Sequence, residues 1–149
     1  MRPFPCIDLE PGDPDFEKGY LCRMTDIDEV IASLALPQPR IEMPYSLLEQ
    51  LPGGLCRMTL LPGYAWNWAS IPILSRWKWY RTLAPYWYRG SGHHDDLYQA
   101  IKLGLLPRSC RDDADRIMLE LIKADGSPWW RRGFDWVGVR LFGGFTLGR

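Results

Sequence analysis

The hydrophobic pattern in the second half of the chain predicts helices. Residues 93–103 and 110–125 place their apolar side chains at helical spacing, and Gly104 follows the first segment as a natural stop. A third helix is expected at 128–142, because Ser127-Pro128 has the favoured arrangement of cap and first-turn residue. Adjacent helices joined by a short turn should pack as an antiparallel hairpin.

The first half of the chain has a less regular pattern. Apolar residues of the segment 27–34 fit one helical face, which predicts a helix there. A short helix or turn is expected at 45–51, and a strand at Leu55–Leu61. The predicted fold is therefore α+β: a small N-terminal β element followed by an α-helical hairpin plus a C-terminal helix.

One short sequence occurs twice in the first half. Leu-Cys-Arg-Met-Thr stands at 21–25 and again at 55–59, so the two copies start thirty-four residues apart. That spacing is the period of a helical repeat, but no third copy supports an array. The two copies are either a coincidence or two similar edge strands.

Length and composition indicate one globular domain over residues 1–149. The chain is 46% hydrophobic and 24% charged, a balance that supports a packed core and argues against a disordered chain. No apolar run is long enough to span a bilayer, and the first residues lack the apolar stretch of a secretory signal. The four cysteines form no C-x-x-C pair, so we expect reduced thiols that serve packing.

The charge distribution bears on the partners of the chain. A net charge of zero argues against specific nucleic-acid binding. Residues 51–94 nevertheless carry five basic and no acidic side chains, together with nine aromatic residues. Within this stretch, alternating Trp and basic residues at Trp77–Arg81 predict a partly exposed contact surface for a protein partner, a membrane or envelope. Stacking on single-stranded bases and plain core packing are the alternatives.

Reactive side chains are densest in His93-His94-Asp95-Asp96-Leu97-Tyr98. On a helix, His94 faces the packed side, whereas Asp115 falls in the apolar stripe of the next helix. A carboxylate buried there needs a partner, so we expect Asp115 to contact His94, with Tyr98 beside them. Such a carboxylate fixes the imidazole tautomer and raises its basicity, as a general base requires. The alternative is a structural polar network.

Four motifs occur in order along the second part of the chain. They are Asn67-x-Ala69-Ser70-Ile71-Pro72, His94-Asp95-x-Leu97-Tyr98, Ser109-Cys110-Arg111-x-x-Ala114-Asp115 and Val139-Arg140-Leu141-Phe142-Gly143. Together they resemble a family found in tailed phages and prophages, catalogued as domain-of-unknown-function family 1353. The similarity covers residues 52–144 and leaves residues 1–50 as an extension. The family usually has Asp where this chain has Asn67, which offers a ligand oxygen without charge.

The His94-Asp95-x-x-Tyr98 segment with Asp115 also resembles secreted phospholipase A₂, especially its bacterial form. This resemblance implies that His94 is the base that activates a water, that Asp95 binds calcium, and that Tyr98 and Asp115 orient the imidazole. Two features of that family are absent from this sequence: the glycine-rich calcium loop upstream and the cysteines that flank the histidine.

The two resemblances lead to two functional expectations. The first is a phage-encoded accessory protein, associated with the virion or tail, which contacts other phage structural proteins and resides in the particle or the host cytoplasm. The second is a metal-assisted lipid hydrolase with His94 as base, and with calcium held by Asp95 and Asn67. Because the calcium loop is missing, we expect phospholipid hydrolysis with calcium to be undetectable or marginal. A protein that modifies the host through partner binding is a third alternative.

Overall fold

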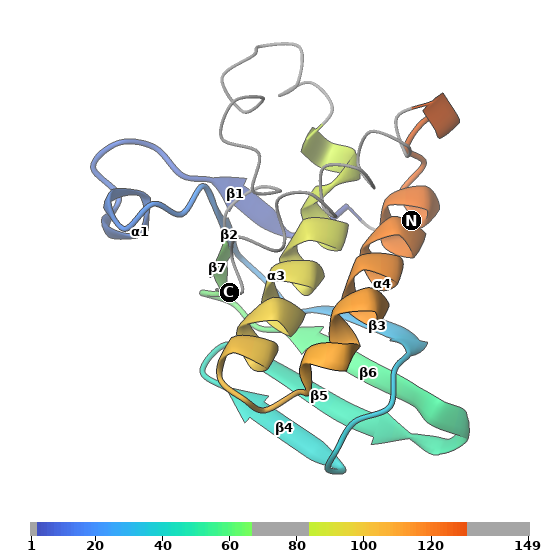
Figure 1. Ribbon diagram of the computed structural model, residues 1–149. Coiled ribbons are helices and arrows are strands. Elements are labelled where there is room, and N and C mark those ends of the chain that lie inside the picture. The colour runs from blue at the N-terminus through green and yellow to red at the C-terminus, as the bar shows by residue number, and fades with distance from the viewer. Residues whose placement is uncertain (1–2, 67–83, 131–149) are drawn as a thin grey trace.

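The computed structural model describes residues 3–66 and 84–130 (Figure 1). It confirms an α+β fold, in which two antiparallel sheets accompany two long helices. The elements in chain order are β1 (Cys6–Asp8), α1 (Pro14–Glu17), β2 (Cys22–Met24), β3 (Asp28–Ser33), β4 (Arg40–Met43), β5 (Ser46–Leu51), η1 (Pro52–Gly54), β6 (Leu55–Leu60), β7 (Ala65–Trp66), η3 (Ala84–Tyr86), α3 (Tyr88–Lys102), η4 (Arg108–Cys110) and α4 (Arg111–Ala124).

The larger sheet has the strand order β3-β6-β5-β4 and supports the helix pair. Side chains alternate between its two faces, as a pleated strand requires. The face toward the helices contributes Ala32, Met58, Leu48 and Ile41 to a core that also includes Leu97, Ile101 and Ile117 from α3 and α4. In Figure 1, α3 and α4 lie side by side above this sheet. The helix pair therefore packs against one face of the larger sheet.

The smaller sheet, with the order β1-β2-β7, lies beside α3 (Figure 1). Its Trp66 is 1% exposed, and the indole Nε1 donates to Ser91 Oγ over 3.1 Å. Two glycines let α3 approach its neighbours closely. A Cβ at Gly90 would stand 2.8 Å from Ile122 Cγ1, and one at Gly92 would stand 3.3 Å from Leu60 Cδ1. Larger residues here would push α3 away from α4 and from the sheets.

The helix predicted over 27–34 is wrong, because this segment forms strand β3. Its apolar residues also fit a strand of period two: Ala32 faces the core, whereas Ile31 is 55% exposed on the other side. The short helix or turn predicted at 45–51 is also wrong. Those residues form β5, which pairs with β6 and buries Leu48 completely. Pairing between distant segments overrides the local pattern in both cases.

The strand predicted at Leu55–Leu61 is confirmed as β6. Both copies of the repeated pentapeptide lie in strands, at β2 and β6, and both strands are interior to their sheets rather than at the edges. Cys22 and Cys56 occupy matching inward positions and are each fully buried. The β part of the described chain is thus larger than the small element predicted.

The two central helices are confirmed. Helix α4 agrees with the predicted range 110–125, whereas α3 begins at Tyr88, five residues before the predicted start. Gly90 and Gly92 are poor helix formers, which hid this first turn in the sequence; the close packing described above compensates for them. Most of the helix predicted at 128–142 lies outside the described residues.

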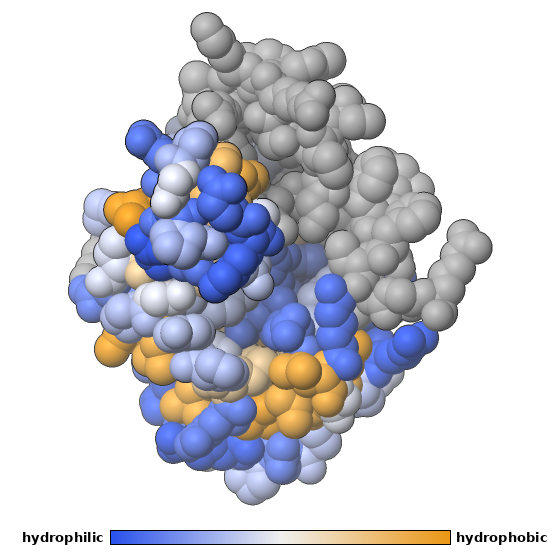
Figure 2. Space-filling model, turned by 90° about the vertical axis from the view of Figure 1, so that its left-hand side faces the viewer, coloured by the Kyte–Doolittle hydropathy of each residue, from blue (hydrophilic) through white to orange (hydrophobic). Residues whose placement is uncertain are grey.

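The described surface is mixed. Figure 2 shows apolar residues gathered in the lower part of one face, with hydrophilic residues around them. Another set of charges lies across β4, β5, β6 and β3, where exposed ion pairs link Arg40 with Glu49 at 3.3 Å and Arg57 with Glu29 at 3.4 Å. Across residues 3–66 and 84–130, every helix is too short or too polar to traverse a bilayer.

Candidate catalytic cluster on α3 and α4

His94, Tyr98 and Asp115 meet between the two helices, as the sequence predicted. His94 Nε2 lies 2.9 Å from Asp115 Oδ1, and the Tyr98 hydroxyl donates to the same oxygen over 2.7 Å. All three side chains belong to buried residues. The rings of His94 and Tyr98, one helical turn apart, are in contact at a centroid distance of 4.1 Å. These contacts fix the positions of the His94 and Tyr98 side chains around the Asp115 carboxylate.

The three groups change one another's acidity. Burial opposes ionisation of Asp115, but hydrogen bonds from His94 and Tyr98 outweigh it and lower the pKa of Asp115. Burial likewise disfavours the imidazolium of His94, yet the hydrogen bond to Asp115 and the negative charge of Asp95 raise its pKa. Burial and the bond to Asp115 raise the pKa of Tyr98. Asp115 is therefore a carboxylate that supports a basic imidazole, while Tyr98 stays a neutral donor.

Asp95 lies on the other side of the imidazole. Its Oδ1 is 3.6 Å from His94 Nδ1, longer than a hydrogen bond, and its side chain is 25% exposed. Burial raises the pKa of Asp95. The two ring nitrogens of His94 thus differ. Nε2 is hydrogen-bonded to the buried Asp115, whereas Nδ1 faces the more exposed carboxylate of Asp95.

The described residues hold no cluster of metal-binding side chains around Asp95. Among residues 3–66 and 84–130, no three His, Cys, Asp or Glu side chains come together in a metal-binding group. Asp95 alone cannot supply the six to eight oxygen ligands that calcium takes. The other predicted ligand, Asn67, lies outside the described residues, as does the contact segment Trp77–Arg81.

Removing the carboxylate tests the contact between the helices. We expect Asp115→Ala to lower the free energy of unfolding by roughly 1–3 kcal/mol, because it leaves the buried His94 and Tyr98 donors without their acceptor. The loss in free energy of unfolding is limited because the His94 imidazolium can become a neutral imidazole. Urea unfolding measures the change, with Asp113→Ala on the same helix as the control, since Asp113 is 46% exposed in its ion pair with Arg116. Equal stability of the two variants would contradict the expectation.

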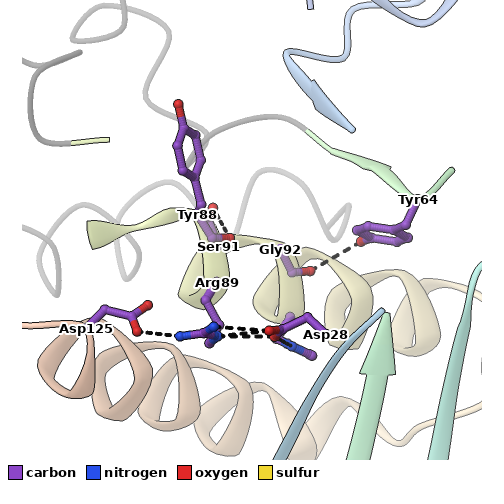
Figure 3. A network of polar contacts seen from close by, with 8 residues as sticks. Asp28, Tyr64, Tyr88, Arg89, Ser91, Gly92 and Asp125 are labelled. Carbon is purple, nitrogen blue, oxygen red and sulfur yellow. Dashed lines mark hydrogen bonds and ion pairs between the residues drawn. The ribbon is translucent and has the colours of Figure 1, made fainter. Parts of the chain in front are cut away.

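A second polar cluster lies near the N-terminal end of α3, and sequence reasoning missed it. Arg89 Nε lies 3.2 Å from both carboxylate oxygens of Asp28, and Nη1 donates to Asp125 Oδ1 over 2.6 Å. Figure 3 shows Arg89 between the two carboxylates, which come from β3 and from the end of α4. His93 Nε2 adds a contact of 3.0 Å to Asp28 Oδ2. The cluster joins the sheet to both helices.

The protonation states in this second cluster follow from burial and pairing. Burial opposes ionisation of Asp28, but bonds from His93 and Arg89 outweigh it and lower the pKa of Asp28. Burial lowers the pKa of His93 and raises that of Asp125. His93 is thus kept neutral while its neighbour His94 becomes more basic. The residue that could have indicated this cluster is Asp28, a buried acid at the start of β3. The prediction of a helix for this segment concealed its inward position.

Asp96, the last residue of the His-His-Asp-Asp segment, binds the larger sheet. It is 2% exposed, and Ser46 Oγ at the start of β5 donates to its Oδ1 over 2.5 Å. Burial raises the pKa of Asp96 to about 7, and the charge of Asp95 adds to the shift. The four consecutive polar residues therefore have different neighbours. His93 contacts Asp28 of the second cluster, and His94 contacts Asp115. Asp95 lies beside His94 Nδ1, and Asp96 binds Ser46 of the sheet.

The raised pKa of Asp96 predicts a dependence of stability on pH. Between about pH 4 and pH 7 the unfolded chain loses the Asp96 proton while the folded chain keeps it, so stability falls as pH rises. Asp96→Asn removes this loss. Its stability relative to wild type should therefore rise with pH, by at most about 1.4 kcal/mol per pH unit. Urea unfolding at pH 5 and pH 8 measures the difference, with the exposed Asp112→Asn as control. Parallel curves for wild type and Asp96→Asn would refute the prediction.

Comparisons with protein-family models, curated proteins and solved structures found no match to this chain. The resemblances to the phage family and to phospholipase A₂ therefore stay predictions, as do the domain limits. The candidate site rests on the geometry of His94, Asp115 and Tyr98 alone.

Proposed function

We propose that the α3–α4 pair is the catalytic centre of a hydrolase that cleaves carboxylic esters in lipids. One observation carries the proposal: His94 Nε2 and the Tyr98 hydroxyl both bind Asp115 Oδ1, at 2.9 and 2.7 Å. This is the set of contacts that the resemblance to phospholipase A₂ implies for a base and its orienting groups. The lipid substrate comes from that resemblance alone.

The arrangement fits activation of a water molecule. Asp115 holds the Nε2–H tautomer, which leaves the Nδ1 lone pair as proton acceptor. In the proposed reaction, Nδ1 takes a proton from water, and the resulting hydroxide adds to the ester carbonyl. The tetrahedral intermediate then expels the alcohol, which receives the proton back from His94. Asp115 stabilises the transient imidazolium, and Tyr98 keeps the carboxylate in place.

Release of fatty acid from mixed phospholipid micelles tests this function. We expect wild-type protein to release fatty acid at a rate that depends on His94. Assays with added calcium and with a chelator determine whether the rate depends on a metal ion. Purified wild type that releases no fatty acid, with or without added calcium, would overturn the proposal. Robust release that requires calcium would place metal ligands in the remainder of the chain.

Our second proposal is a phage-encoded accessory protein, associated with the virion or tail, in which the helix pair is a structural platform. The phage context comes from the sequence resemblance alone. The second cluster supports the structural-platform part, because the buried side chains of Arg89, Asp28 and Asp125 join both helices to the sheet. Mass spectrometry of purified particles tests this proposal. Detection at a fixed copy number supports it, and absence from particles made by a phage that expresses the protein contradicts it.

A further inference from the structure

The hydrogen bonds around His94 extend one residue beyond Asp115 and Tyr98. Arg111, the first residue of α4, donates from Nε to the Tyr98 hydroxyl oxygen over 3.3 Å. The Tyr98 hydroxyl uses its single hydrogen for Asp115 and accepts from Arg111 on its oxygen. The hydrogen bonds therefore run in one direction, from the guanidinium through the phenol to the carboxylate.

We propose that Arg111 is a positioning residue for His94, which acts through the Tyr98 hydroxyl and the Asp115 carboxylate. The inference rests on the proposed function, because it concerns how the base of that reaction is held. Arg111 touches none of the reacting atoms in the proposed step. Its role is to fix the rotation of the Tyr98 hydroxyl so that the hydrogen points at Asp115.

Helix geometry explains why Arg111 can do this. Arg111 and Asp115 are four residues apart on α4 and so lie on the same side of the helix. Tyr98 reaches between them from α3, one turn after His94. The planar guanidinium presents Nε–H in a fixed direction, whereas a lysine ammonium on its flexible stem does not. A hydroxyl that already accepts from a cation is also a stronger donor to its own acceptor.

Among residues 3–66 and 84–130, the other charged groups discussed around the imidazole have different contacts. On α3, Asp95 approaches Nδ1 and not the carboxylate of Asp115. From the sheet, Asp28 is engaged by Arg89 and His93, and Ser46 binds Asp96. Of these groups, only Arg111 supplies a cation to the Tyr98 side of the network.

The experiment compares Arg111→Gln with wild type by kinetics and proton NMR. We expect kcat to fall by roughly tenfold, the effect of losing about 1.4 kcal/mol of transition-state stabilisation, with KM unchanged because no substrate contact is lost. The downfield resonance of His94 Nε2–H, hydrogen-bonded to Asp115, should broaden through faster exchange with water. Arg111→Lys, which keeps the positive charge, should recover part of the loss in kcat and part of the sharpness of the Nε2–H resonance. Arg108→Gln removes an exposed charge one turn away and should match wild type.

Tyr98→Phe distinguishes action through the hydroxyl from a general effect of charge. In that background, Arg111→Gln should produce no further loss in kcat. Additive losses would overturn the inference, as would an Arg111→Gln protein with wild-type kcat and an unchanged Nε2–H resonance. If the wild type releases no fatty acid, the proposed function fails, and the NMR comparison alone decides whether Arg111 positions His94. Thermal unfolding of each variant identifies losses that reflect only a less stable fold.

Discussion

Arg89→Met is expected to lower the free energy of unfolding by about 3–5 kcal/mol, the cost of removing one partner from a buried ion pair. Methionine retains much of the apolar stem but removes the cation. Asp28 and Asp125, which are at most 9% exposed in these pairs, would then lie buried without the guanidinium between them. A loss of this size is a large share of the stability of an ordinary domain.

Arg40→Met is the matched control for this prediction. Arg40 also pairs with two carboxylates, those of Glu42 and Glu49, but its side chain is 56% exposed. Exposed pairs contribute roughly 0–1 kcal/mol, so this variant should remain close to wild type. Chemical denaturation of the three proteins at neutral pH measures the difference. Similar small losses for both variants would show that the buried cluster contributes no more than the surface pairs.

His94→Gln is expected to reduce kcat for ester hydrolysis by about 10²- to 10⁴-fold, the usual contribution of a general base. The glutamine amide can still donate to Asp115, so the carboxylate keeps a partner, but it cannot take a proton from water. The loss should therefore fall on kcat without a matching loss of stability. Initial rates on mixed micelles and urea unfolding of the same samples measure the two effects.

The adjacent histidine provides the control. His93 is 1% exposed and binds Asp28 in the second cluster, away from the proposed reaction. Under conditions in which the variant is folded, His93→Gln should retain its hydrolytic activity, even if its free energy of unfolding is lower than that of wild type. If His93→Gln lost as much activity as His94→Gln at matched folded fraction, the assignment of His94 as the base would be wrong.

The sequence alone determined the helix pair and its central contact. Helical spacing located α3 and α4 within a few residues at most boundaries. The contact between His94 and Asp115 followed from one physical rule, that a carboxylate in an apolar stripe needs a partner, and the structure confirms it. Such predictions succeed because both the helical period and the burial of a charge can be judged from neighbours in the sequence.

Only the tertiary structure decided the sheet and the second cluster. The segment 28–33 satisfies a helical stripe as well as an alternating strand, and pairing with β6 selects the strand. Arg89 lies 61 residues from Asp28 and 36 from Asp125, and no local pattern links them. Strand pairing and buried ion pairs depend on which distant segments meet, so their energies appear only when the chain is folded.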